Sequence, residues 1–130
     1  MPTIFSRIIQ GEIPCYKIAE NDNFFAFLDI NPLAKGHTLV VPKQETDYLF
    51  NIGDEELGQM MVFAKHVAVA IEKAIPCKRI GLAVIGLEVP HAHIHLVPIS
   101  TEGDLDFKKA HLSLSQEEFV AIQERITAQL

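Results

Sequence analysis

Three histidines alternate with apolar residues in residues 91–97, which read His-Ala-His-Ile-His-Leu-Val. Because successive side chains of a strand point to opposite faces, a strand places His91, His93 and His95 together on one face. A helix would scatter the same residues around its axis, since positions two apart point about 200° apart. The stretch therefore predicts a strand with an apolar face that packs on a core and a face of imidazoles.

The flanking segments predict an α+β fold. Apolar residues recur at helical spacing after three capping residues, Thr3, Asp54 and Ser115. Five segments have the extended patterns of strands, and they span residues 15–19, 24–29, 37–41, 79–86 and 91–97. The longest helix, from Asp54 up to Pro76, should cover one face of the sheet, and residues 101–109 should form a loop. This order of elements favours a mainly antiparallel sheet.

Length and charge narrow the class of protein. With 130 residues, the chain is expected to form one domain, residues 1–130. A net charge of -6 argues against a broad basic face for nucleic acid or anionic membranes. No apolar stretch approaches the roughly 20 residues that span a bilayer, and the first residues lack a secretory pattern. The two isolated cysteines, Cys15 and Cys77, indicate reduced thiols and a cytoplasmic protein.

The histidine row has three interpretations. The histidines could lie on the solvent face of an edge strand with a purely structural role. They could bind a metal, although His91 and His95 would be about 13 Å apart, too far to share one ion easily. A metal would then need His93 with one neighbour and further ligands, for which the candidates are His37, His66 and Glu88.

The third interpretation is covalent catalysis. Neutral imidazole is a nucleophile at pH 7, and its pKa of about 6.5 lets it attack phosphorus and then leave. Neighbouring imidazoles disfavour one another's protonation, which keeps a nucleophile neutral. His93 has a histidine on each side and is therefore the natural candidate for the attacking residue.

The histidine row and the blocks upstream of it resemble one family. Residues 91–97 fit the signature of the histidine triad (HIT) superfamily, in which histidines alternate with hydrophobic residues. Four further blocks look like those of its Hint-like branch in the same order, and they are Ile4-Phe5 with Ile8-Ile9, Gly11 to Pro14, Phe27 to Pro32 and Gly36 to Lys43. The resemblance covers residues 3–99 and leaves residues 100–130 as a C-terminal extension.

This resemblance implies a fold and an activity. The fold would be a five-stranded antiparallel sheet with a long helix on one face, a short N-terminal helix and an extra C-terminal helix. The activity would be that of a hydrolase or phosphoramidase acting on the α-phosphate of a purine nucleotide conjugate through a nucleotidyl-histidine intermediate. A dinucleoside polyphosphate hydrolase and a nucleotide-binding or scaffold protein with little turnover are the alternatives. The expected partners are an AMP-like nucleotide and a second copy of the chain, and the scheme requires no metal or other cofactor.

The resemblance also implies roles for individual residues. By position, His93 resembles the nucleophile, His91 and His95 its triad partners, and His37 a fourth histidine near it. Asp29 resembles the carboxylate that binds the ribose, since a carboxylate can accept from both hydroxyls of a cis-diol. As an alternative, Asp29 is a turn residue ahead of Asn31-Pro32. The residues that resemble base-pocket walls, each equally compatible with ordinary core, are Phe5, Ile8, Ile13, Phe27 and Ile30.

Glu88 departs from the branch, which usually has Ser or Thr there in contact with the phosphate and leaving group. Since a carboxylate repels a phosphate, Glu88 is expected to orient a triad imidazole or to accept a hydrogen bond from a leaving amine.

A second departure concerns structural zinc. Many bacterial relatives bind zinc at positions that hold Thr3, Ser6 and Glu45 here, so we expect no zinc site and a free His91. His66 and His111 are expected to have no role in the site.

Overall fold

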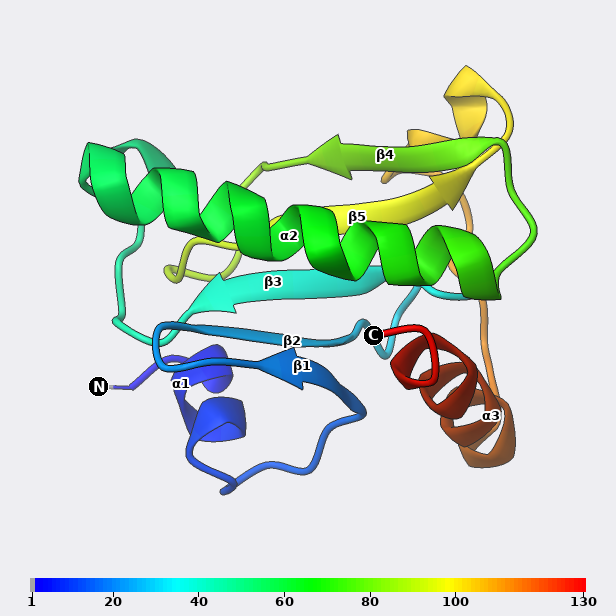
Figure 1. Ribbon diagram of the computed structural model, residues 1–130, viewed down its shortest axis with the longest axis horizontal. Helices are drawn as coiled ribbons and strands as arrows, with labels where there is room; N and C mark the ends of the chain where they lie inside the picture. The colour runs from blue at the N-terminus through cyan, green and yellow to red at the C-terminus, as the bar shows by residue number, and fades with distance from the viewer. Residues whose placement is uncertain (1) are drawn as a thin grey trace.

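Five strands form one antiparallel sheet in the computed structural model, which describes residues 2–130 (Figure 1). The strands are β1 (Lys17–Glu20), β2 (Phe24–Leu28), β3 (Thr38–Pro42), β4 (Arg79–Ala83) and β5 (Ile94–Ile99). Their order across the sheet is β1-β2-β3-β5-β4, and each neighbouring pair is antiparallel. The predicted α+β fold with a five-stranded antiparallel sheet is confirmed.

Three helices accompany the sheet, and they are α1 (Ile4–Ile9), α2 (Asp54–Ala74) and α3 (Gln116–Thr127). Thr3 caps α1 as predicted, and its side chain accepts a hydrogen bond from the Ser6 N–H. Ser115 and Glu118 form the predicted capping box of α3. Two short 3₁₀ turns, Leu49–Asn51 and Glu102–Leu105, lie in the connections, so the second of them interrupts the loop predicted for residues 101–109.

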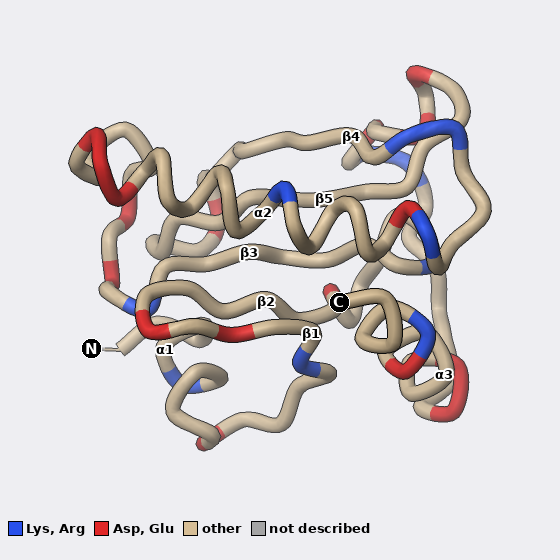
Figure 2. Tube along the Cα trace, in the orientation of Figure 1, with Lys and Arg blue, Asp and Glu red and all other residues tan. Residues whose placement is uncertain are grey.

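The beginning of α2 differs from the prediction by one residue. Gly53, not Asp54, is the N-cap, because the Gly53 carbonyl already accepts the first helical hydrogen bond, from Leu57 N–H at 2.8 Å. Three acidic residues, 54–56, occupy the first turn (red at the end of α2 in Figure 2). Their carboxylates are favoured there by the partial positive charge of the helix N-terminus.

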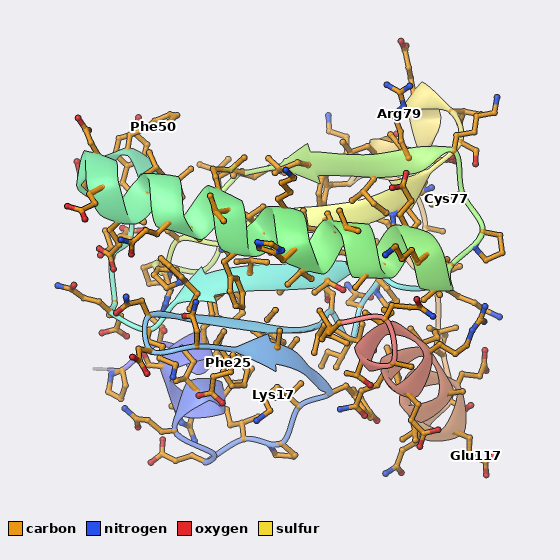
Figure 3. All side chains as sticks on the ribbon, viewed as in Figure 1. Lys17, Phe25, Phe50, Cys77, Arg79 and Glu117 are labelled. Carbon is orange, nitrogen blue, oxygen red and sulfur yellow. The ribbon has the colours of Figure 1, made fainter. Side chains whose placement is uncertain are left out.

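The two faces of the sheet have different coverings. In β2, Phe24, Ala26 and Leu28 belong to the main hydrophobic cluster with α2, which lies across the front of the sheet in Figure 1. Phe25 and Phe27 belong to a second cluster with Phe5 of α1. Since side chains alternate along a strand, α1 and α2 cover opposite faces. Figure 3 labels Phe25 beside α1.

The C-terminal helix α3 packs on the same side as α2. Its buried residues Phe119, Ile122 and Ile126 join the main cluster, and the ring of Phe119 stacks on Tyr16 with centroids 4.8 Å apart. Arg125 donates to the Ala74 carbonyl at the end of α2 at 2.6 Å. The C-terminal segment is therefore part of the packed core on that face.

The histidine strand is shorter than predicted. β5 begins at Ile94, so His91 and His93 precede it, and β4 ends at Ala83 rather than at Gly86. Just before β5, the backbone makes a hydrogen bond to a loop and not to a neighbouring strand, since the Ala92 N–H donates to the Thr46 carbonyl oxygen at 2.6 Å. The prediction of one continuous strand over residues 91–97 is wrong in this respect.

The edge-strand interpretation of the histidines is also wrong. β5 lies between β3 and β4, inside the sheet. The three side chains are buried, with relative exposures of 0% for His91, 7% for His93 and 8% for His95. Among residues 2–130, no helix is both long and apolar enough to cross a membrane.

Candidate active site

A continuous row of aromatic rings crosses the sheet face opposite α2. The Phe5 ring from α1 makes edge contacts with His91 and His93, at centroid distances of 5.7 and 5.0 Å. His93 contacts His95 at 4.9 Å, and His95 contacts His37 at 5.2 Å. The structure therefore brings together all four histidines that the sequence indicated.

Hydrogen bonds fix the tautomer of His91. Its Nε2 lies 2.8 Å from the Pro42 carbonyl oxygen, and because a carbonyl only accepts, Nε2 carries the proton. Nδ1 is then an acceptor, and the Thr3 hydroxyl donates to it at 2.7 Å. Burial lowers the pKa of His91, and this effect outweighs the hydrogen bond to Pro42 and the nearby Glu45 carboxylate, which act to raise it. His91 is therefore neutral and held from both sides.

His91 in turn orients His93 through its backbone. His93 Nδ1 lies 2.8 Å from the His91 carbonyl oxygen, so Nδ1 must be the donor. The proton of a neutral His93 consequently sits on Nδ1, and its Nε2 keeps a free lone pair. This is the arrangement that a nucleophilic imidazole needs.

A second chain of hydrogen bonds orients His95. The Leu33 N–H donates to His37 Nδ1 at 3.0 Å, which leaves the His37 proton on Nε2. His37 Nε2 lies 3.0 Å from His95 Nδ1 and donates to it, so His95 carries its own proton on Nε2. Burial lowers the pKa of His37 to about 3 and that of His95 to about 4, and neighbouring imidazoles add to both shifts. At neutral pH, His95 is thus an uncharged N–H donor.

The side chains of His93 and His95 line a cleft of about 340 Å³. The cleft lies between the segment that joins β4 to β5 and the segment that follows β5, and its lining residues are Asn31, Ile85, Gly86, Leu87, Glu88, Val89, His93, His95, Phe107 and His111. Glu88 lines it, as the sequence suggested. His91 and His37 are not among the lining residues, but each is hydrogen-bonded to one that is, His91 to His93 and His37 to His95.

His111, which was expected to have no role, is one of the residues that line the cleft. Phe107 was not singled out from the sequence, yet its ring packs edge-on against His95 and His37, with ring centroids 4.7 and 6.2 Å apart. The two residues belong to a polar segment with no periodic pattern. The only sequence signal was an aromatic residue and a histidine spaced four apart, which is weak.

Asp29 lies at the end of β2, beside the histidines. Its Oδ1 accepts from the Asn31 N–H at 2.8 Å, which is the turn-forming contact considered as its alternative role. Its Oδ2 lies 3.6 Å from His37 Nε2. Burial raises the pKa of this carboxyl, and it does not line the cleft.

The five residues expected to form base-pocket walls do not all cluster. Phe5 and Phe27 lie in the cluster on the α1 face, with ring centroids 5.6 Å apart, and Ile8 packs against that cluster. Ile13 is half-buried and lies outside it. Ile30 is 72% exposed.

Asp29, His37 and His95 could each offer one ligand atom to a metal, with those atoms within 4.8 Å of one another. The hydrogen bonds do not fit such a site. The Leu33 N–H occupies the lone pair of His37 Nδ1, so the nitrogen that faces His95 is protonated and has no lone pair for a metal.

The positions considered for structural zinc form a hydrogen-bonded network instead. The Thr3 backbone N–H and the Ser6 hydroxyl both donate to Glu45 Oε1, the second of these at 3.0 Å. His91 Nδ1 accepts from the Thr3 hydroxyl. Zinc prefers thiolate, imidazole and carboxylate ligands, but here two of the positions hold hydroxyls, both nitrogens of the imidazole are engaged, and the Glu45 carboxylate already accepts hydrogen bonds, so the set is a poor one for zinc.

Removing the Thr3 hydroxyl is expected to destabilise the fold. Thr3→Val leaves the buried Nδ1 of His91 without a donor and removes the cap of α1. We expect the free energy of unfolding in urea to fall by about 1–3 kcal/mol. Thr3→Ser is the matched control, because it keeps the hydroxyl and should stay within about 0.5 kcal/mol of the wild type. Equal stability of the Val and Ser variants would show that the hydroxyl does not hold His91.

Comparisons with known proteins agree with this geometry. A family model described as the HIT domain matches residues 10–102. An adenosine 5′-monophosphoramidase of Schizosaccharomyces pombe is 34% identical over 133 residues, which cover 100% of this chain and 99% of that protein. An uncharacterised HIT-like protein of Borreliella burgdorferi is 34% identical over 132 residues, which cover 95% of each chain.

A solved structure has the same fold. The crystal structure of a HIT-like protein from Bartonella henselae aligns with a TM-score of 0.84 at 28% identity, covering 98% of this chain and 96% of that one. The similarity therefore extends over the C-terminal helix as well as the sheet.

Proposed function

The chain belongs to the HIT family, and from that premise we propose that it hydrolyses AMP-like nucleotide conjugates as a phosphoramidase, with His93 as the nucleophile. The observation that carries the proposal is the pair of hydrogen-bond chains that leave His93 with a free Nε2 lone pair and His95 with a free Nε2–H. His93 supplies a nucleophile and His95 a hydrogen-bond donor, and both line the same cleft. The full-length similarity to an adenosine 5′-monophosphoramidase supports the choice of substrate class.

The reaction runs in two displacements. His93 Nε2 attacks the α-phosphorus, an N–P bond to His93 forms, and the P–N bond to the amine breaks as the amine takes a proton from solvent. The His95 Nε2–H donates to a phosphoryl oxygen and stabilises the charge that builds there. Water then attacks the same phosphorus, which releases the nucleoside monophosphate, returns His93 to its neutral form and gives a proton to solvent.

Three groups around this centre have proposed supporting roles. Glu88 accepts a hydrogen bond from the departing amine, which fits its place in the cleft lining. Asp29 binds the ribose hydroxyls through the carboxylate oxygen that its turn does not use. The base lies against apolar residues of the α1 face, for which Phe5, Phe27 and Ile8 are the proposed contacts.

The discriminating experiment offers the purified protein three ligands in parallel. We expect it to release AMP and ammonia from adenosine 5′-phosphoramidate, in EDTA as well as without it, and to form an alkali-stable, acid-labile adenylyl-protein in rapid quench. Faster turnover of a diadenosine polyphosphate would replace the proposal by polyphosphate hydrolysis. Binding of AMP without turnover of either substrate would indicate a binding protein.

The proposed assembly is a homodimer in a reducing cytoplasm. β4 is one of the two outermost strands of the sheet, with one edge unpaired within the described residues (Figure 1). Apolar side chains are exposed on and beyond this strand, at Leu82, Val84 and Ile85, which is typical of an interface. Both cysteines are free thiols. Sedimentation equilibrium should give twice the chain mass of 14.5 kDa, and the monomer mass would contradict the proposal.

A further inference from the structure

The cleft lacks a conventional group for binding a phosphate. Among the described residues that line it, none is Lys or Arg, and the one acidic side chain, Glu88, repels anions. The chain as a whole carries a net charge of -6. Lys and Arg are scattered over other parts of the molecule, as the blue segments of Figure 2 show. His37 and His95 are held neutral by burial, which lowers the pKa of each.

His111 is in a different hydrogen-bonding situation from these histidines. Its Nδ1 lies 2.6 Å from the Asn31 carbonyl oxygen, and its Nε2 lies 3.1 Å from the Phe107 carbonyl oxygen. A neutral imidazole has only one N–H, whereas two carbonyl partners require two donors. Only the imidazolium can make both bonds, so this environment stabilises the positive charge.

Most of the groups around His111 also raise its pKa. Hydrogen bonds to Asn31 and Phe107 raise its pKa most, and the carboxylates of Asp29 and Glu88 raise it further. Partial burial of His111 opposes them, and the other imidazoles at the cleft are those of His93 and His95, with His37 beside His95. Those imidazoles oppose the cation only when they are themselves charged, and the hydrogen bonds above keep His37 and His95 neutral.

The segment that carries His111 is tied to the site at two further points. The Leu112 N–H donates to the Pro32 carbonyl at 2.8 Å, which anchors this segment to the loop after β2. The Phe107 ring packs against His95. The ring of His111 is therefore held at the cleft wall, near the imidazoles that would act on the phosphorus.

We propose that His111, as an imidazolium, supplies the positive charge that binds the substrate phosphate in this cleft. The inference deepens the proposed function and rests on it for the identity of the anion. Because both N–H groups already donate to carbonyls, His111 attracts the phosphate by charge and leaves direct hydrogen bonding to His95. Binding of the anion should therefore weaken as pH rises through the His111 pKa.

Direct binding measurements test this separately from turnover. The probes are the methyl ester of AMP, which keeps one negative charge between pH 5 and 9, and adenosine, which has none. Isothermal titration at pH 6 and pH 8.5 compares the wild type with His111→Gln, and His66→Gln on the exposed face of α2 serves as the matched control. NMR titration of the wild type follows the His111 ring directly.

The expected result is a loss that depends on charge and pH. At pH 6, His111→Gln should bind the ester about three- to tenfold more weakly than the wild type, with adenosine binding unchanged. At pH 8.5 the two proteins should bind the ester alike, His66→Gln should match the wild type throughout, and the His111 ring should titrate above about pH 6.5.

Two outcomes would overturn the inference. One is equal binding of the ester by the wild type and His111→Gln at pH 6. The other is an equal loss of adenosine binding, which would mean that the residue acts only through structure. If the ester binds with the expected pH dependence but the phosphoramidate is not hydrolysed, the inference is supported while the proposed function fails.

Discussion

Replacing His93 with alanine is expected to lower kcat for adenosine 5′-phosphoramidate by at least about 10³-fold. Among the described residues that line the cleft, His93 is the one imidazole whose Nε2 lone pair the hydrogen bonds leave free, and the variant loses it. AMP binding should remain within about threefold of the wild type, because the proposed contacts to the base, the ribose and the phosphoryl oxygens come from other residues. Steady-state kinetics and titration with AMP measure the two quantities.

The control and a rescue experiment sharpen this test. His66→Ala alters an exposed histidine of α2 on the opposite face and should retain full activity. Free imidazole added to His93→Ala should restore part of the turnover, since it can occupy the space of the lost ring and attack the phosphorus. Wild-type activity in His93→Ala would rule out this residue as the nucleophile.

The second large effect concerns acid stability. The pKa values of folded His37 and His95, about 3 and about 4, lie below the value of about 6.5 expected in the unfolded chain. Between these values the unfolded chain binds more protons, so the free energy of unfolding falls as pH falls below about 6.5. The stabilisation is complete above that pH. By pH 4, the lowered pKa of each histidine should reduce the free energy of unfolding by on the order of 1–3 kcal/mol.

Urea unfolding from pH 7.5 to pH 5 measures this slope before most carboxylates titrate. Two groups act in the opposite direction: His111 and Asp29 have raised pKa values and therefore stabilise the fold as they gain protons. His37→Gln should show a shallower slope than the wild type, whereas the exposed His66→Gln should show the same one. A wild-type stability that is flat over this range would contradict a neutral, buried His37 in the folded protein.

Features encoded by short sequence patterns were predicted well. Thr3 and Ser115 cap the helices that follow them, because a cap needs only a side-chain oxygen and an N–H three residues away. The alternation in residues 91–97 indicated neighbouring imidazoles, and in the structure the His93 and His95 rings are in contact while the Phe5 ring contacts both His91 and His93. The errors at Gly53 and at the beginning of β5 are shifts of one to three residues at the ends of elements, where local pattern is weakest.

Contacts between distant segments could not be predicted in the same way. His111 donates a hydrogen bond to the Asn31 carbonyl oxygen, 80 residues away, and no local pattern distinguishes His111 from the exposed His66. The same holds for Glu45, whose carboxylate accepts from Ser6 across 39 residues. The residues that contact His111 and Glu45 depend on how loops from distant parts of the chain pack together around the sheet.

The sequence by itself determined which residues could do chemistry, since the spacing of the histidines and the period of a strand are both local properties. Only the tertiary structure decided the protonation of each imidazole. The proton of His91 is fixed by Thr3 and Pro42, that of His37 by the Leu33 N–H, and that of His95 by His37. A histidine's tautomer and charge are set by the atoms that face its two nitrogens, and folding brings those atoms from separate parts of the chain.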